Sequence, residues 1–266
     1  MKQFALTFAL LAMLSGAALA VPQVVATHAV LAEIVSIVAG DQVEVTTIIP
    51  SGFCPGHYDL SPSDYATLIQ ADLVLYSGFE PWVEQLAGRT KERALVLLAG
   101  SWNTPADARQ QTVAIADLLS ERIPDAASAF AVHRDVYIEA LSQLATSLQE
   151  RAFALGAAET SVVCMQWQAS FVSWLGFDVA VTYGLPENLS LRDLVLLADQ
   201  GRAANAMLVI DNLQSGIEFG GKLAREVNAV HVVLSNFPGA LPNTATLLDL
   251  LARNAEALFT AIQPIE

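Results

Sequence analysis

The stretch AASAFAVHRDVYIEALSQLATSLQERAFAL, residues 126–155, decides the architecture of this chain because it contains neither glycine nor proline before Gly156. Its apolar residues recur at helical spacing: Tyr137, Ile138, Leu141, Leu144, Ala145, Leu148, Ala152 and Leu155. A helix of about 30 residues is ~45 Å long, which exceeds the usual globular helix, and glycine commonly ends a helix. The pattern predicts a spine helix over 125–156 that joins two lobes, 21–124 and 157–266.

Short β-type runs alternate with helical segments on both sides of this stretch. We expect strands at 24–26, 43–49, 73–76, 94–98, 161–165, 178–182, 207–210 and 230–234. We expect helices at 30–38, 63–70, 81–86, 105–121, 171–175, 190–199, 217–227 and 244–262. This order predicts an α/β fold in which each lobe has a roughly four-stranded parallel sheet flanked by helices.

Residues 1–20 have the pattern of a secretory signal peptide, with Lys2, an apolar run from Phe4 to Leu14, and the small-residue ending Ala18-Leu19-Ala20. We expect cleavage after Ala20, and the alternative is a retained N-terminal anchor. The pattern predicts export across the cytoplasmic membrane to a periplasmic or other extracytoplasmic location.

The chain is strongly acidic, with a formal net charge of −14. Removal of residues 1–20 leaves 12 basic against 27 acidic residues, a net charge of −15. Such a charge repels nucleic acid, which excludes DNA and RNA as partners. The two cysteines, Cys54 and Cys164, could form a disulfide in an oxidising compartment or remain two separate thiols near a site.

The stretch TIIPSGFCPGHYDLSPSD, residues 47–64, holds His57 and Cys54 in a loop stiffened by several prolines and glycines. Ligands of open parallel sheets bind beyond the carboxyl ends of the strands. His57 follows the second expected strand and His28 follows the first, while Cys164 and Met165 end the first strand of the second lobe. We therefore expect all of these side chains to converge on one cleft and to be candidate metal ligands.

Several segments resemble the metal-binding solute-binding proteins of ABC importers, the zinc and manganese receptors of the TroA-like, cluster A-I group. VVATHAVLAEIVSIVAGDQVEVTTIIPSG (24–52) is similar to their first strand, helix and second strand. GHYDLSPSDYATLIQADLVLYSGFEPWVEQL (56–86) resembles their His-x-Tyr-x-x-x-Pro-Ser-Asp segment, and WNTPADARQQTVAIADLL (102–119) resembles a later helix. LSLRDLVLLAD, AMLVIDNLQS and LAREVNAVHVVL resemble the second lobe. The resemblance implies a cleft between two lobes, a bound metal ion, and an ABC permease with its ATPase as partners.

The ligand set that this resemblance implies is degenerate in this chain. His57 matches the first ligand of the family, but Gly100 stands at the second ligand's position, two residues before Trp102. The third position falls at Met165, or at Gln166 in a register shifted by one. The fourth, where an acid is expected, falls near Ser235 or Asn236. The His-rich loop of the family is also absent from the sequence.

The donors that remain are soft: the imidazole of His57 and sulfur from Cys54, Cys164 and Met165, with His28 as a further candidate. Such donors suit zinc or a softer ion such as copper, beside the zinc and manganese of the resemblance. Alternatively, Gly100 clears space in a cleft lined by Tyr58, Trp102 and Trp167 for a metal chelate or small organic ligand.

We therefore expect a monomeric solute-binding protein for a metal ion, and its alternatives are a receptor for a chelate or organic ligand and a ligand-free adhesion or structural module. We expect no enzyme, since the sequence has no Gly-x-Ser-x-Gly, His-Glu-x-x-His or phosphate-loop motif. His133 and His231 are expected to be a solvated and a structural histidine, respectively.

Overall fold

The computed structural model describes residues 21–263. The predicted signal peptide, residues 1–20, lies outside the described residues. Among the helices that are described, none combines the length and hydropathy needed to cross a membrane.

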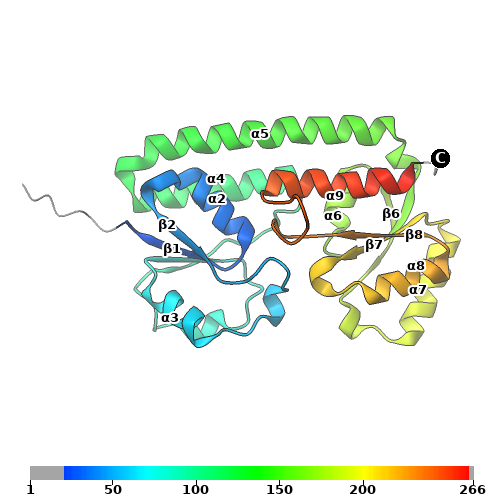
Figure 1. Ribbon diagram of the computed structural model, residues 1–266, viewed down its shortest axis with the longest axis horizontal. Coiled ribbons are helices and arrows are strands. Elements are labelled where there is room, and N and C mark those ends of the chain that lie inside the picture. The colour runs from blue at the N-terminus through cyan, green and yellow to red at the C-terminus, as the bar shows by residue number, and fades with distance from the viewer. Residues whose placement is uncertain (1–20, 264–266) are drawn as a thin grey trace, which may run out of the picture.

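The first half of the chain folds around a four-stranded parallel sheet with strand order β2-β1-β3-β4 (Figure 1). Its strands are β1 (Gln23–Ala26), β2 (Glu44–Thr47), β3 (Leu73–Tyr76) and β4 (Leu95–Leu97). Its helices are α2 (Ala29–Ala39), α3 (Pro62–Gln70) and α4 (Pro105–Arg122). Capping boxes at Ser61 and Thr104 start α3 and α4, because each hydroxyl accepts from the backbone N–H three residues later and the aspartate there reciprocates.

The second half repeats this architecture with a parallel sheet of order β6-β5-β7-β8. Its strands are β5 (Ser161–Met165), β6 (Asp178–Tyr183), β7 (Leu208–Asn212) and β8 (Val230–Leu234). Its helices are α6 (Ala169–Trp174), α7 (Leu191–Ala203), α8 (Glu218–Val227) and α9 (Leu247–Ile262). Residues that follow the carboxyl ends of strands in both sheets lie together in the region between the two lobes.

The long helix α5 (Ala127–Ala154) lies along one side of the molecule and spans both lobes (Figure 1). It packs on α4 and α2 of the first lobe and on α9 of the second. The apolar stripe predicted from the sequence faces inward, with Tyr137, Leu141, Leu148 and Ala152 fully buried. One continuous apolar core, formed by residues of α5 and of both lobes, therefore holds the lobes together.

The fold class predicted from the sequence, two parallel-sheet lobes with a long connecting helix, is confirmed. The expected helix over 81–86 is a short 3-10 turn, Val83–Leu86, and α7 extends beyond the predicted end to Ala203. The boundaries 21–124, 125–156 and 157–266 stay a prediction for domains that move as units.

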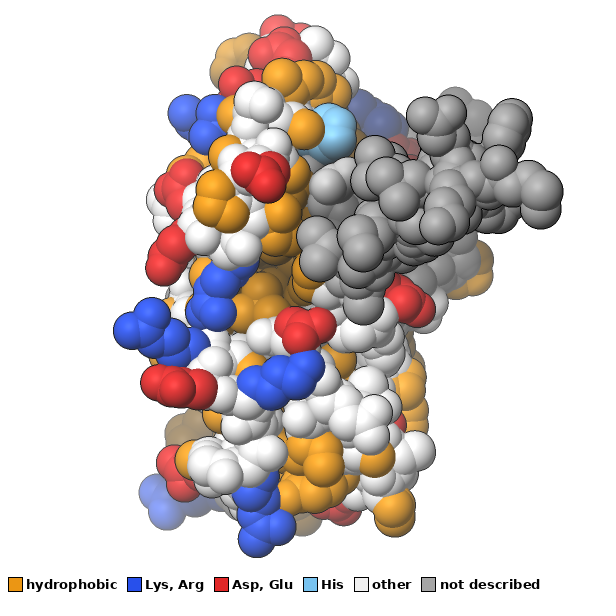
Figure 2. Space-filling model, turned by 90° about the vertical axis from the view of Figure 1, so that its left-hand side faces the viewer, with side chains coloured by type: hydrophobic (Ala, Val, Ile, Leu, Met, Phe, Trp, Pro, Cys, Tyr) orange, Lys and Arg blue, Asp and Glu red, His pale blue; other side chains and the backbone are white. Residues whose placement is uncertain are grey.

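The surface seen from the end of the first lobe carries both signs of charge (Figure 2). Basic and acidic side chains alternate over this face, with apolar side chains between them. The excess negative charge of the chain therefore does not form a uniform acidic field on this side of the molecule.

Candidate functional site

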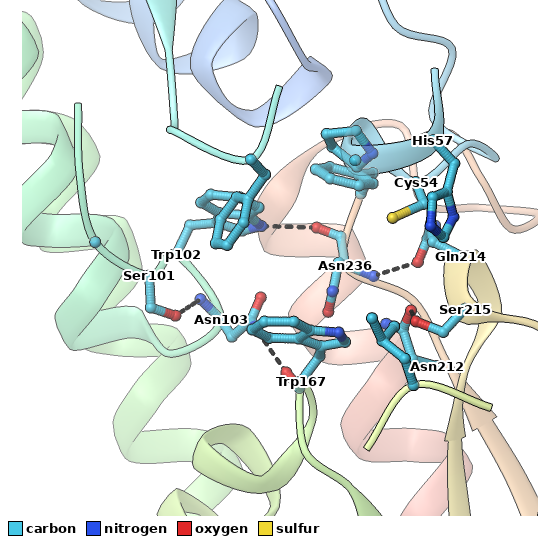
Figure 3. Close-up of a pocket in the computed structure, with 16 residues that line it drawn as sticks. Cys54, His57, Ser101, Trp102, Asn103, Trp167, Asn212, Gln214, Ser215 and Asn236 are labelled. Atoms are coloured by element: carbon cyan, nitrogen blue, oxygen red, sulfur yellow. Dashed lines mark hydrogen bonds between the residues drawn. The ribbon is translucent and has the colours of Figure 1, made fainter. Parts of the chain in front are cut away.

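A cavity of about 340 Å³ lies between the two lobes (Figure 3). The first lobe contributes the loop after β2, the loop after β3 and the segment before α4, while the second contributes the loops that follow β5 to β8. Its lining residues are Cys54, Pro55, Gly56, His57, Phe79, Gly100, Ser101, Trp102, Asn103, Trp167, Leu185, Asn212, Gln214, Ser215, Asn236 and Phe237. The cavity therefore occupies the position where open parallel sheets bind ligands.

His57 and Cys54 lie on the same wall of this cavity, as the proline-rich loop places them. A 3-10 turn, Pro55–His57, begins right after Cys54, and the His57 N–H donates to the Cys54 carbonyl at 3.0 Å. The His57 side chain is 61% exposed, and its Nε2 lies 3.3 Å from Oε1 of Glu187 in the second lobe. This exposed contact joins the two lobes at the mouth of the cleft, where solvent weakens it.

Aromatic rings from both lobes form the apolar walls of the cavity. Phe79 of the first lobe meets Trp102 edge-on at 6.3 Å and Trp167 of the second lobe at 5.7 Å between ring centroids. Trp102 also lies 5.7 Å from Phe237 of the second lobe. The rings thus line the cleft across the boundary between the lobes.

Three side chains tie the lobes together at the cavity wall. Trp102 Nε1 donates to the Asn236 carbonyl at 2.9 Å, and Asn103 Nδ2 donates to the Trp167 carbonyl at 2.7 Å. Gln214 Nε2 donates to the Ser51 carbonyl at 2.9 Å. Because these bonds are partly buried, they hold the two lobes together more firmly than exposed contacts do.

Asn212 ends β7 at the cavity and is almost completely buried. Its Oδ1 accepts a hydrogen bond from the Ser215 hydroxyl at 3.0 Å. Its Nδ2 is buried and has no hydrogen-bond partner among the described residues. A buried amide N–H without a hydrogen-bond acceptor costs free energy, so an acceptor atom placed next to Asn212 Nδ2 would recover this cost.

Four of the residues that we expected to line the cleft do line the cavity: Gly100, Trp102, Trp167 and Asn236. The predicted metal ligands His57 and Cys54 line it as well. Gly100 adopts φ +119°, and a Cβ there would come within 3.1 Å of Gln111 Nε2. This backbone geometry and the close approach favour glycine, so the position supplies no side-chain ligand.

The prediction that Cys164 and Met165 converge on the cleft is corrected by the structure. Both side chains are fully buried in the sheet, and neither lines the cavity. Cys164 faces the core beneath α5, and burial, with the nearby charge of Asp211, raises the pKa of its thiol well above the usual range. The Met165 sulfur accepts a hydrogen bond from the Trp167 N–H at 3.2 Å. Both cysteines are free, so the alternative of a disulfide is wrong.

His28 also lies behind the cavity wall rather than on it. Its ring lies 4.4 Å from Trp102 and 5.2 Å from Phe237, centroid to centroid. Burial lowers the pKa of this imidazole to about 4, opposed by the charge of Glu80. Neither ring nitrogen has a partner among the described residues, and the neutral ring packs as an aromatic group.

The other three lining predictions are corrected as well. The Tyr58 hydroxyl donates to Asp64 Oδ2 at 3.0 Å, and its ring packs on the core cluster around β3 and α3. Gln166 is exposed outside the cavity. Ser235 is buried beneath the floor, where its hydroxyl donates to the Phe237 carbonyl and accepts from Gln214 Nε2.

Sequence reasoning missed several lining residues, above all Phe79, Asn103, Asn212 and Gln214. Asn212 could have been found, because it ends a parallel strand at the edge where ligands bind. Phe79 follows β3 in the same way. Within residues 21–263, no group of three or more His, Cys, Asp or Glu side chains is arranged to hold a metal ion.

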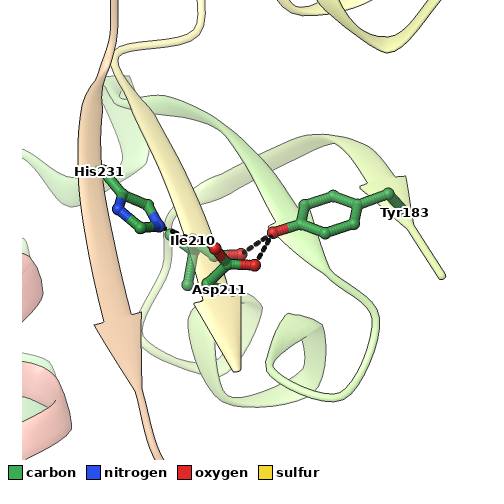
Figure 4. A network of polar contacts seen from close by, with 4 residues as sticks. All are labelled: Tyr183, Ile210, Asp211 and His231. Carbon is green, nitrogen blue, oxygen red and sulfur yellow. Dashed lines mark hydrogen bonds and ion pairs between the residues drawn. The ribbon is translucent and has the colours of Figure 1, made fainter. Parts of the chain in front are cut away.

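A separate polar network lies inside the second lobe (Figure 4). The fully buried Asp211 accepts a hydrogen bond from the Tyr183 hydroxyl and pairs with His231, whose Nε2 lies 2.8 Å from Oδ2. Tyr183 also donates to the Ile210 carbonyl at 3.1 Å. Burial and the Asp211 charge raise the pKa of Tyr183 far above its usual range. His231 is thus a hydrogen-bonded histidine, and the network lies outside the cavity lining.

Comparison with known proteins gives curated relatives that match part of this chain. MntA, a manganese-binding lipoprotein of Halalkalibacterium halodurans, is 24% identical over 140 residues, which are 46% of this chain and 47% of MntA. FimA, a metal ABC transporter substrate-binding lipoprotein of Streptococcus parasanguinis, is 41% identical over 56 residues, 21% of this chain and 18% of FimA. The chain thus matches about half of the first curated relative and about a fifth of the second.

The structure of the periplasmic zinc-binding protein TroA from Treponema pallidum superposes with a TM-score of 0.79 over 91% of this chain and 99% of that chain, at 19% identity. Finally, the family described as zinc-uptake complex component A, periplasmic (ZnuA), matches residues 24–261. Because this match covers nearly all of the described residues, the chain belongs to the ZnuA family.

Proposed function

We propose that this chain is the solute-binding protein of an ABC importer, which captures a transition metal in the cleft between its lobes and delivers it to a membrane permease. The observation that carries the proposal is the family match over residues 24–261 together with an inter-lobe cavity that contains His57. The relatives MntA and TroA are described as manganese-binding and zinc-binding.

Within the cleft, His57 and Cys54 would contact the metal. An imidazole nitrogen and a thiolate sulfur suit zinc and softer ions such as copper, whereas manganese prefers oxygen donors. Gln214, Asn236 and Trp102 position the lobes around the cavity through the bonds between them. The proposal assigns capture and delivery to the chain, with no catalytic step.

The proposal includes export and partners. Residues 1–20 direct the chain across the cytoplasmic membrane, where it acts as a monomer that meets the permease and its associated ATPase. Mass spectrometry of the extracytoplasmic fraction should give a mature N-terminus at Val21. A chain found only in the cytoplasmic fraction would contradict this assignment.

Deletion of the gene tests the proposed transport function directly. In metal-limited medium, we expect the cellular content of one of zinc, manganese or copper to fall several-fold, as measured by elemental mass spectrometry. The wild-type gene should restore that content, and excess of the same metal should restore growth. Unchanged content of all three metals in the deletion strain would overturn the proposal.

A further inference from the structure

The cleft is larger and more apolar than a site for a bare ion requires. A cavity of about 340 Å³ falls within the roughly 300–1,000 Å³ of small-molecule pockets. Its aromatic rings, Phe79, Trp102, Trp167 and Phe237, offer flat surfaces from both lobes. Such walls provide no donor atom that could coordinate a metal ion, but they pack well against an organic group.

The charge of the cavity lining also fits a bare divalent ion poorly. Among the described lining residues there is no Asp, Glu, Lys or Arg, and the titratable side chains are those of His57 and Cys54. The buried Glu80 does not help, because its carboxylate already accepts bonds from Thr27, Ser77 and Gly78. The lining itself offers a doubly charged ion at most one thiolate, since the Glu187 carboxylate beside His57 is exposed at the mouth and lies outside the lining. An uncompensated charge is costly to desolvate.

Asn212 distinguishes a bare ion from a ligand that has acceptor atoms of its own. Asn212 lines the cavity, and its Nδ2 is a hydrogen-bond donor that has no partner among the described residues and almost no exposed surface. A cation cannot accept this hydrogen bond and is repelled by the positive end of the N–H dipole. A carboxylate or carbonyl oxygen satisfies the group and gains a bond in a site of low dielectric.

We propose that the cleft takes its metal as a complex with a small organic chelator that carries carboxylate oxygens. His57 and Cys54 occupy the coordination positions that the chelator leaves open. Asn212 Nδ2 donates to a chelator oxygen, and the rings of Trp102 and Trp167 flank its carbon skeleton. This inference rests on the proposed function and specifies the form in which the metal binds.

Binding measurements with defined probes test this inference. The exported chain is titrated with Zn²⁺, Mn²⁺, Cu²⁺ and Ni²⁺ alone, with each metal complexed by citrate or L-histidine, and with both chelators alone. We expect at least one complex to bind at least tenfold more tightly than its bare metal and its free chelator. Native mass spectrometry should then show metal and chelator bound together.

Variants of Asn212 give the sharpest control. Asn212→Asp keeps the shape but replaces the donor by a carboxylate, so we expect binding of the complex to weaken tenfold or more and bare-ion binding to strengthen. If Asn212→Asp leaves both affinities unchanged while the melting temperature shows a folded protein, the assigned hydrogen bond is wrong.

A pair of tryptophan variants keeps the test independent of Asn212. Trp167→Leu removes a cavity wall, whereas Trp174→Leu alters a tryptophan of the same region that stacks on Phe171 outside the cavity lining. We expect the first to weaken binding of the complex several-fold and the second to leave it unchanged. Equal effects of the two variants would contradict the stacking of the chelator on Trp167.

The outcomes separate this inference from the proposed function. A bare metal that binds as tightly as every complex overturns the chelate and leaves the transport proposal intact. Binding of a chelator without any metal overturns both. Binding of no probe in any form also overturns the inference, and the metal content of the deletion strain then decides the transport function by itself.

Discussion

At the scale of single residues, the carboxylate of Asp211 leaves no room for any side chain at Gly220 of α8. A Cβ at Gly220 would lie 2.6 Å from Asp211 Oδ1 and closer still to Oδ2. That carboxylate is fully buried and holds both Tyr183 and His231, so it has no room to move.

We expect Gly220→Ala to lower the free energy of unfolding by roughly 1–3 kcal/mol, because overpacking displaces the buried Asp211 carboxylate from its partners. Its matched control is the neighbouring Gly221→Ala, whose Cβ would meet His231 at an ordinary 3.4 Å. Urea unfolding should show the control unchanged or stabilised by up to about 1 kcal/mol through helix propensity. Equal stability of the two variants would refute the close-contact argument.

Only some residues of the cleft could be predicted from motifs and from the order of the strands. His57 and Trp102 could be placed because loops after parallel strands meet at one edge. Met165 was placed wrongly, because both faces of β5 are covered: Cys164 belongs to one apolar cluster and Met165 to another, on the opposite face.

At the scale of elements, Glu33 of α2 connects the lobes by accepting from the first N–H of α9. Both of its oxygens lie within 2.9 Å of the Leu247 nitrogen. Burial raises the pKa of Glu33 to about 7, the bond from Leu247 opposes this rise, and the charge of Asp249 adds to it. Tyr137 of α5 lies against the same carboxyl group.

The raised pKa makes stability depend on pH in a defined window. The folded state holds the Glu33 proton more tightly than the unfolded state does. The contribution of this protonated carboxyl to the free energy of unfolding is therefore complete below pH 4.5 and is lost as the pH rises to about 7. The loss is on the order of 2–3 kcal/mol. Glu33→Gln should remove this component from the pH profile of unfolding, while the exposed Glu121→Gln should keep it. Parallel profiles of wild type and Glu33→Gln would show that the group titrates equally in both states.

Elements were predictable because their ends are marked locally. Ser or Thr followed three residues later by Asp marks the starts of α3, α4, α7 and α9. The start of α9 was nevertheless expected at Thr244, although the local pair Thr246 and Asp249 marks a start after Thr246. The contact of the Leu247 N–H with Glu33 of the other lobe could not be predicted from local sequence.

At the scale of the whole molecule, α5 and the continuous core beneath it resist hinge motion between the lobes. We expect ligand binding to change the radius of gyration by less than about 1 Å, since bending would break packing along both lobes. Small-angle scattering with and without a ligand that raises the melting temperature measures this change. A compaction of several ångströms would contradict the rigid arrangement.

The cavity as a whole could not be predicted from the sequence. Its wall joins Trp102 to Asn236 and Asn103 to Trp167, residues more than 60 positions apart that only the packing of two lobes brings together. The resemblance predicted that Gly100 replaces one metal ligand of the family, and that assignment stays a prediction, although Gly100 does line the cavity.

The unequal surroundings of the two cysteines have a practical consequence. Cys54 lines the cleft while Cys164 is sealed in the sheet, and the chain has two cysteines in all. A thiol-reactive fluorophore applied to the native fold should therefore label a single position beside the cavity. Because Cys54 is also a proposed metal contact, a bound ligand should slow this labelling, so the labelling rate of the wild-type protein, with no engineered mutation, would report when the cleft fills.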